Sequence, residues 1–257
     1  MDDEALAALE LDAVLARLEA ATATPYGAER ALALVPAADR AAVVYRQTQT
    51  SEAVALLDDA AEPELHGVAE IREDVARAER GGLLTPRALA DVAGVAEAAV
   101  RLQPHETAPL LSELVAHVDA SLRGLAEEIR ARVDDEGGGL RDTASPRLRQ
   151  LRQELRRSRR GVEEALQRLA RSAALQPHLQ ETFVAERSGR PVLAVKASSR
   201  ASVPGIVHDA SASGQTLFVE PFEAVELNNR HAEAVAAERD EVERILDELS
   251  RLVERHA

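Results

Sequence analysis

The residue types best suited to chemistry lie in one block, residues 205–221. Its middle reads His-Asp-Ala-Ser-Ala-Ser-Gly from position 208 to position 214. Histidine, aspartate and serine are the side chains from which nucleophilic triads are built. Neighbouring residues of a strand point to opposite faces, however, so His208 and Asp209 are not placed to bond to each other. We therefore predict that these polar residues form a tight turn with Gly214 at positive φ, and a ligand-contacting loop is the alternative.

A second group of functional residue types is a run of arginines between residues 147 and 160. Guanidinium groups bind both carboxylates and phosphates. The interpretation we favour pairs the run with acidic residues of a helix that returns alongside it, and phosphate binding is the alternative. The arginines are Arg147, Arg149, Arg152, Arg156, Arg157, Arg159 and Arg160. The acidic residues are Glu238, Asp240, Glu241, Glu243 and Asp247.

Motifs for metal and nucleotide chemistry are weak or absent. Residues 58–59 and 134–136 are acidic and could attract a hard cation, but such runs are more often solvated loops, which we predict here. The only lysine, Lys196, is followed by Ala197, so the chain has no G-x-x-x-x-G-K-[ST] sequence. We therefore expect this chain to bind no ATP of its own and to carry no catalytic or metal site.

Composition excludes several classes of protein. Apolar residues make up 46% of the 257 residues but aromatic residues only 2%. Much of the apolar fraction is alanine, which favours helices and buries little area, so we expect thin helical layers and long arms. The chain has no cysteine, which excludes disulfides and thiolate metal sites. It shows no signal sequence and no apolar run of membrane length, so we predict a cytoplasmic protein without membrane partners.

Charge is segregated along the chain. The net charge of −14 argues against a nucleic-acid partner. Residues 1–140 carry 27 acids and 12 bases, whereas residues 141–171 carry ten arginines and four acids. Residues 221–257 return to ten acids and five arginines. A local basic stretch attracts phosphate whatever the total charge is, so a polyanionic partner remains open.

Apolar spacing and helix-breaking residues predict the elements of the first half. Thr85 followed by Pro86 is typical of a helix N-cap. Residues 134–139 form a polar, glycine-rich loop, which we predict to be a domain boundary. The predicted helices span residues 4–20, 27–34, 37–60, 68–80, 86–102 and 108–134.

The second half predicts two long helices with a β-rich insert between them. One helix fits residues 146–175, with Ser145 as its cap, and the other runs from about residue 222 to 257. Leucines at three- and four-residue spacing are typical of a coiled coil. The predicted seams contain Leu148, Leu151, Leu155, Val162, Leu166 and Leu169, and Val225, Ala232, Val235, Val242, Ile245, Leu249 and Leu252. The second helix has no stop signal, so we expect the natural protein to continue.

Four β-like segments lie in the insert. Residues 188–189, Ser-Gly, are typical of a turn. All three phenylalanines of the chain lie in or beside the insert, and we predict that they form its aromatic core. The predicted strands span residues 183–186, 191–196, 205–208 and 216–219.

Over essentially its whole length the chain resembles the MutS family, and specifically its second bacterial branch, the MutS type-two proteins. The resemblance rests on residues 190–196, Arg200, residues 205–221 and the Glu-Leu-Asn-Asn sequence at 226–229. Upstream residues 9–12, 71–79 and 83–86 are similar to the same branch. Pro191, Ala194 and Pro204 depart from the family pattern.

The resemblance implies a mainly α fold, in which a helical core leads into a long antiparallel lever coiled coil with a small β-rich clamp inserted at its tip. The predicted domains are the helical core at 1–140, the ascending lever helix at 141–180, the clamp at 181–221 and the returning lever helix at 222–257. The family implies that a P-loop ATPase, with ATP and magnesium, and a nuclease domain follow in the full-length protein. This chain would be truncated before both of them.

The implied function is that of a nucleic-acid clamp. Type-two members are linked to suppression of homologous recombination and to splitting of collided ribosomes. The implied partners are branched or double-stranded DNA, ribosomal RNA, or both, and a second copy in a homodimer. Two alternatives stay open. One is a metal-dependent endonuclease site near Asp12, in the acidic motif of some relatives, and the other is a purely structural or dimerisation scaffold.

Cations of the clamp are the predicted contacts with a polyanion. Short strands that project cations make sequence-independent contacts with a phosphate backbone. Exposed charges on an ordinary small sheet are the alternative. The sequence shows no base-reading motif and no aromatic stacking platform, which favours recognition of shape. The predicted residues are Arg187, Arg190, Lys196, Arg200 and His208.

Overall fold

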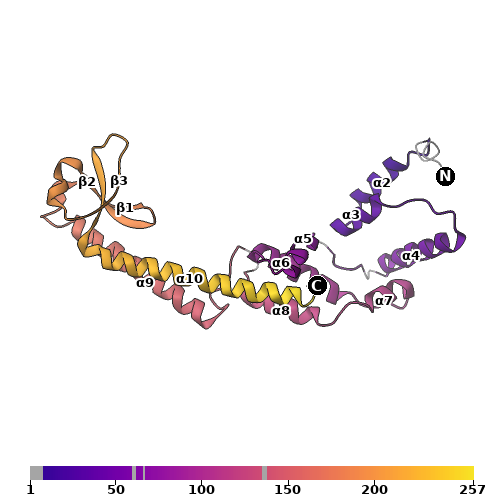
Figure 1. Ribbon diagram of the computed structural model, residues 1–257. Coiled ribbons are helices and arrows are strands. Elements are labelled where there is room, and N and C mark those ends of the chain that lie inside the picture. The colour runs from indigo at the N-terminus through magenta and orange to yellow at the C-terminus, as the bar shows by residue number, and fades with distance from the viewer. Residues whose placement is uncertain (1–7, 60–61, 66, 135–137) are drawn as a thin grey trace. The chain divides into compact units, whose positions relative to one another are not determined.

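The chain folds as two compact units (Figure 1), here taken from a computed structural model that describes residues 8–59, 62–65, 67–134 and 138–257. The first unit comprises residues 1–141 together with 245–257, and the second comprises residues 142–244. No helix among the described residues has both the length and the apolar character needed to cross a bilayer.

The first unit is helical. Buried Leu89 and Ala93 face a core shared with Leu125 and Ile129, where α6 packs against α8. Thr85 caps α6 as predicted, because its Oγ1 accepts a hydrogen bond from the amide of Ala88 at 3.2 Å. The helices are α2 (Leu11–Ala20), α3 (Pro25–Leu32), α4 (Arg40–Asp58), α5 (Arg72–Glu79), α6 (Pro86–Arg101), α7 (Pro109–Val115), α8 (Leu122–Arg132) and the end of α10 (Phe222–Glu254).

The predicted single helix at 108–134 is wrong, because α7 and α8 are separate helices. Between them the carboxylate of Asp119 accepts a hydrogen bond from the amide of Ser121 at 2.8 Å. Aspartate side chains that bond to nearby amides offer the backbone an alternative to helical hydrogen bonds. The apolar periodicity continues through this turn, so it did not show where the helix ends.

The second unit contains two antiparallel helices. Helix α9 (Pro146–Ala170) is capped by Ser145, whose Oγ accepts from the amide of Leu148 at 2.9 Å, as predicted. Three side-chain bonds join α9 to the first part of α10. The residue numbers rise on α9 as they fall on α10, as expected for antiparallel helices. They are Ser145 to Glu241 at 2.7 Å, Arg152 to Glu238 at 3.0 Å and Ser158 to His231 at 3.0 Å.

These links between the two helices are polar rather than apolar. On α9 the predicted seam residues Leu148, Val162 and Leu166 are buried. On α10, however, Ala232 is exposed and Val235 is 46% exposed. Because an apolar seam must be buried along both partners, the coiled coil is not confirmed.

A four-stranded antiparallel sheet lies between the two helices in sequence, with strand order β1-β2-β4-β3. All four predicted strands are present, and each is as long as predicted or longer. Ser188 and Gly189 both have positive φ, 53° and 73°, which confirms the predicted turn. The strands are β1 (Leu179–Arg187), β2 (Arg190–Lys196), β3 (Gly205–Ala210) and β4 (Thr216–Pro221), with short 3-10 helices η1 (Gln176–His178) and η2 (Ala197–Ser202) beside them.

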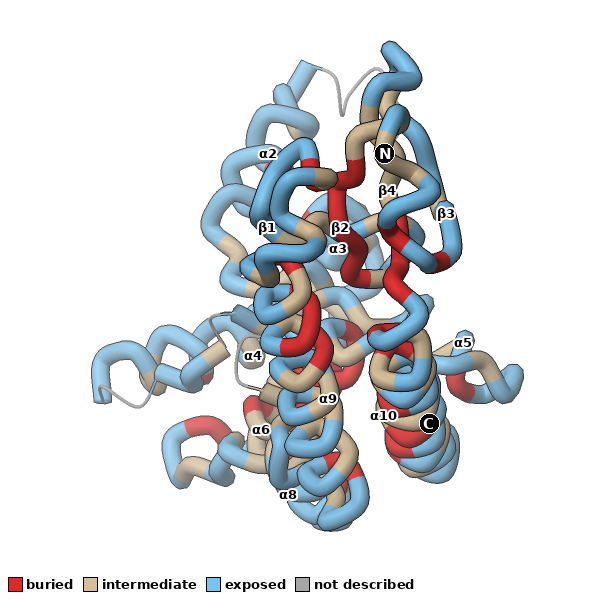
Figure 2. The backbone as a smooth tube through the Cα atoms, turned by 90° about the vertical axis from the view of Figure 1, so that its left-hand side faces the viewer, coloured by how far each residue is buried: buried red, intermediate tan, exposed pale blue. Residues whose placement is uncertain are grey.

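The core of the sheet is aliphatic. Figure 2 shows buried residues concentrated along β2 and β4, where Leu193, Val195 and Val219 pack with the end of α9. The predicted aromatic core is wrong, because Phe183 is 59% and Phe222 61% exposed. Two aromatic side chains are therefore left on the surface of this unit.

Strands β3 and β4 approach each other closely at Gly205. A Cβ atom on this residue would lie 2.2 Å from the carbonyl oxygen of Glu220 and 2.8 Å from a methyl group of Val219. The carbonyl oxygen is a backbone atom and cannot move without shifting β4, which is paired with β2 and β3 on its two sides. Glycine is therefore required where β3 begins.

We predict that Gly205→Ala destabilises the second unit by about 1–3 kcal/mol, the usual cost of overpacking a well-packed core. Hydrogen–deuterium exchange of the β3 and β4 amides measures the loss. Gly161→Ala is the matched control, because a Cβ there would meet open space on α9. Equal protection in both variants would contradict the steric argument.

Candidate nucleic-acid interface

A buried carboxylate organises the sheet. The side chain of Glu220 on β4 is 0% exposed. Its Oε1 accepts from Arg190 Nη1 at 2.6 Å and from Asn228 Nδ2 at 2.8 Å, and its Oε2 contacts His208 Nε2 at 2.5 Å. Arg190 also donates to Asn229 Oδ1 at 2.7 Å. The network thus joins β2, β3 and β4 to the beginning of α10.

Sequence reasoning missed the roles of Glu220 and Asn228. A signal was present, since Glu220 stands between Val219 and Pro221 at the end of an otherwise apolar strand. A carboxylate in such a strand needs partners, because burying an unpaired charge is costly. Among the described residues Asn228 Oδ1 is a buried side-chain atom that lacks a hydrogen-bond partner.

The residues of a possible triad do not form one. The pairing of β3 with β4 shifts register between Val207 and Asp209, so His208 lies in an irregular position and reaches Glu220. Asp209 instead pairs with Arg187 at 3.2 Å. Ser211 accepts from the amide of Thr216 at 3.1 Å, which closes the turn, and Gly214 has the predicted positive φ of 68°.

The remaining predicted cations also have partners within the second unit. Arg187 is 37% exposed and lies over the ring of Phe218 at 3.6 Å. Lys196 Nζ donates to the carbonyl of Pro177 at 2.9 Å, and Arg200 donates to the carbonyls of Val203 and Gly205 at 2.9 and 2.8 Å. Phosphate contacts of these five residues stay a prediction, and each residue has a bond within the second unit.

The arginine run on α9 divides into paired and unpaired members. Arg147 and Arg152 bond to acids of the returning helix, Glu241 at 3.6 Å and Glu238 at 3.0 Å, as we favoured. Arg156 pairs instead with Asp142 at 3.5 Å, before α9, and Arg159 with Glu163 at 3.1 Å, on α9 itself. Pairing with the returning helix therefore accounts for part of the run.

Five exposed arginines follow one face of α9, and we call them the arginine stripe. At about 100° per residue they lie within an arc of about 100° and extend along about 30 Å of helix. None of them forms an ion pair in residues 142–244, all of which the structure describes. One acid, Glu164, shares their face. The stripe consists of Arg149, Arg157, Arg160, Arg168 and Arg171.

The second unit is nearly neutral in an acidic chain. Its residues, 142–244, include 16 Arg and Lys and 15 Asp and Glu, for a net charge of +1. The first unit carries 15 Arg and Lys and 30 Asp and Glu, for a net charge of −15. The negative charge of the chain therefore belongs to the first unit.

Glu241 anchors α10 to the beginning of α9. Its side chain is 1% exposed and accepts hydrogen bonds from Arg244 at 2.7 and 2.9 Å and from Ser145 at 2.7 Å. The bonds from Arg244, then the bond from Ser145, lower the pKa of Glu241 from 4.5 to about 2, although burial opposes them. The carboxylate is thus charged at neutral pH.

The acidic residues considered for metal binding do not gather. No group of three or more His, Cys, Asp or Glu side chains could hold an ion in the described ranges. Asp12 is exposed in the first turn of α2. Asp59 accepts from Thr107 Oγ1 at 3.2 Å and Asp134 from the amide of Gly138 at 2.7 Å, while residues 135–136 lie outside the described residues.

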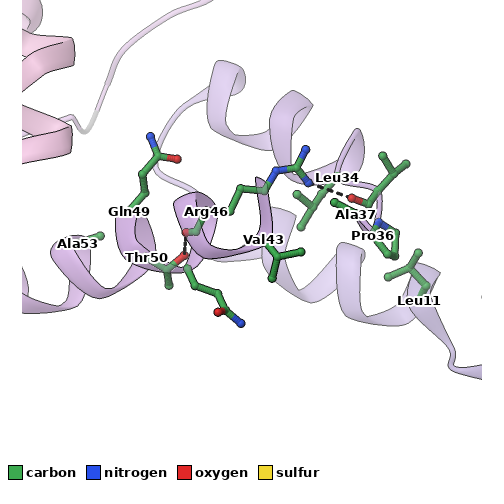
Figure 3. A pocket seen from close by; sticks show the side chains of 11 residues that line it. Leu11, Leu34, Pro36, Ala37, Val43, Arg46, Gln49, Thr50 and Ala53 are labelled. Atoms are coloured by element: carbon green, nitrogen blue, oxygen red, sulfur yellow. Dashed lines mark hydrogen bonds between the residues drawn. The ribbon is translucent and has the colours of Figure 1, made fainter. Parts of the chain in front are cut away.

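A cavity of about 580 Å³ lies beside α4 in the first unit (Figure 3). Leu11, Leu34 and Val43 line it. Two of its polar side chains are engaged by the protein, since Arg46 donates to the carbonyl of Val35 and Thr50 to that of Arg46, both at 3.0 Å. The arrangement offers little specific chemistry to a ligand.

Comparison with known proteins gives relatives but no matching family model. Over 98% of its length the chain is 42% identical to Endonuclease MutS2 of Symbiobacterium thermophilum, of which it covers 32%. Over its whole length it is 40% identical to Endonuclease MutS2 of Geobacillus thermodenitrificans and 39% identical to that of Pelotomaculum thermopropionicum, and it covers 33% of each. The chain thus spans about one third of these curated relatives.

We predict that Arg190→Ala destabilises the sheet by about 3–5 kcal/mol, because it leaves the buried charge of Glu220 without its guanidinium partner. Arg187→Ala is the control and should cost about 1 kcal/mol, since its pair with Asp209 is exposed. Hydrogen–deuterium exchange of the β2 and β4 amides measures both. Similar losses in the two variants would mean that Glu220 does not depend on Arg190.

We predict that the second unit loses stability as the pH falls from about 5 to about 2. The pKa of Glu241 is lower in the folded protein than in the unfolded chain, so its contribution is complete above about pH 5 and disappears as the carboxylate is protonated. Glu241→Gln should flatten this dependence. Amide exchange at the beginning of α9, measured at several pH values, checks it, and an unchanged slope would show that other groups govern the transition.

Proposed function

Because the chain belongs to the MutS2 branch of the MutS family, we propose that its second unit binds the phosphate backbone of nucleic acid without reading the base sequence. The observation that carries this proposal is the arginine stripe. Its guanidinium groups are exposed and form no ion pair within residues 142–244, and this unit has a net charge of +1. The relatives' name, Endonuclease MutS2, favours DNA as the polyanion.

The geometry of the stripe suits a duplex backbone. Double-stranded DNA carries one negative charge per about 1.7 Å of axis, so a straight row of cations about 30 Å long lies beside many phosphates. Helix α9 holds the row in place, since its opposite face is buried through Leu148, Val162 and Leu166. Arginine forms bidentate bonds with phosphate, and such contacts are independent of sequence.

The five predicted contact residues of the sheet fall into two groups, phosphate contacts and positioning residues. We retain Arg187 and Lys196 as phosphate contacts, because their side chains reach the surface. Arg190, Arg200 and His208 direct their N–H groups to protein acceptors. We propose that these three position the sheet, and that they affect binding only through its stability.

In the whole protein we propose that this unit grips branched or double-stranded DNA, with ribosomal RNA as the alternative polyanion. The chain contains no P-loop sequence and spans about one third of its relatives. We therefore assign ATP and magnesium binding, strand cleavage and pairing into a homodimer to other parts of the whole protein. We propose a cytoplasmic location, where such partners occur.

The test is fluorescence anisotropy of the chain with a four-way DNA junction and a linear duplex at several salt concentrations. We expect Arg157→Glu/Arg168→Glu to weaken binding at least about tenfold and to reduce the salt slope by about 0.9 for each lost phosphate contact. Arg230→Glu/Arg239→Glu is the matched control, with the same charge change at two exposed arginines of α10. It should retain most of the affinity.

Each outcome discriminates between functions. Equal losses of affinity in both double variants would mean that binding depends on net charge alone, which would contradict a site on α9. Stronger binding to ribosomal RNA than to the junction would shift the target to the ribosome. No binding of either nucleic acid at low salt would support the scaffold alternative.

A further inference from the structure

A groove of about 660 Å³ lies in the second unit between α9, β1 and α10. Four of its lining residues form a single row along α9 at intervals of four, the spacing that places side chains one above another on a helix. They are Arg159, Glu163, Gln167 and Arg171. Arg171 also belongs to the arginine stripe, so the groove opens beside the stripe.

Phe183 gives this groove an aromatic wall. It belongs to the edge strand β1, whose pairing with β2 shifts register between Leu179 and Val184. Such irregularities redirect side chains, and Phe183 lines the groove while remaining 59% exposed. Val235 of α10, 46% exposed, adds apolar surface to the same groove. The unit thus leaves an aromatic ring in a cavity instead of burying it.

The hydrogen bonds around His231 show which of its ring nitrogens donates and which accepts. Ser158 donates its only hydroxyl proton to the carbonyl of Leu155 at 3.0 Å, so His231 Nδ1, 3.0 Å from the same hydroxyl, is the donor to it. Burial and the charge of Arg159 lower the pKa of His231, which keeps the ring neutral at pH 7. Its Nε2 is then an acceptor, and it has no partner in the described second unit.

The charges of the groove nearly cancel. The lining holds two arginines and two glutamates. Arg159 pairs with Glu163 at 3.1 Å, and Arg171 and Glu186 are the other two. A phosphate group would gain little from such a lining. A flat, uncharged, hydrogen-bonding ring would find an aromatic face in Phe183 and an acceptor in His231.

We propose that this groove binds one unpaired nucleobase, which stacks on Phe183 while the arginine stripe holds the flanking phosphates. The proposal rests on the proposed function, since the stripe must first bind the backbone. An aromatic platform beside a basic track is the general arrangement for single-stranded nucleic acid. The sequence alone shows no such platform, because the exposure of Phe183 depends on how β1 pairs with β2.

The test compares two DNA duplexes that differ in one extrahelical position, a bulged adenosine in one and a bulged abasic residue in the other. The backbone is the same, so the difference in affinity of the 257-residue chain reports the base alone. Stacking of one base on an aromatic side chain corresponds to about fivefold or more in affinity. We expect the chain to prefer the bulged adenosine by at least that factor, as measured by anisotropy.

Phe183→Ala should remove the preference and leave the affinity for the abasic duplex unchanged, whereas Phe183→Tyr should keep it. Phe222→Ala is the matched control, because Phe222 is 61% exposed but does not line the groove. Loss of the preference in both alanine variants, or in neither, overturns the proposal. Equal binding of both duplexes by the unaltered chain, with binding still sensitive to Arg157→Glu/Arg168→Glu, overturns this inference and leaves the proposed function standing. No binding of either duplex overturns both.

Discussion

The second unit is built around one buried negative charge. Removing the carboxylate of Glu220 from water is costly, and the cost is offset only because Arg190, His208 and Asn228 bond to it together. Those partners come from β2, β3 and α10, so the charge is satisfied only when three separate segments are in register. The same bonds turn Arg190 and His208 toward Glu220, so the sheet has few basic groups left to contact a phosphate.

Arginines on different faces of α9 have different surroundings. Arg152 turns toward α10 and bonds to Glu238, whereas Arg149, three residues earlier, is exposed. Polar side-chain bonds join the two helices at three places. On α9, therefore, Arg147 and Arg152 serve the pairing of the two helices, and the exposed arginine stripe forms the proposed binding surface.

Features that depend on local sequence were predictable. The four strands, the Ser188–Gly189 turn, the caps at Ser145 and Thr85 and the positive φ of Gly214 all follow from residues within a few positions of one another. Features that depend on residues distant in sequence could not be predicted. No local pattern shows that a register shift exposes Phe183, or that Glu220 collects residues from other segments. The family was recognisable for the same reason as the strands, because its motif is contiguous.

The uneven charge of the two units bears on how a polyanion would first meet the chain. A net charge of −15 on the first unit repels nucleic acid at long range, while the second unit, at +1, does not. Electrostatic fields of this kind bias the orientation of diffusional encounters before any specific bond forms. The acidic unit would thus reduce unproductive collisions by electrostatic repulsion. Rising ionic strength would weaken this repulsion and also the attraction of the stripe for phosphates.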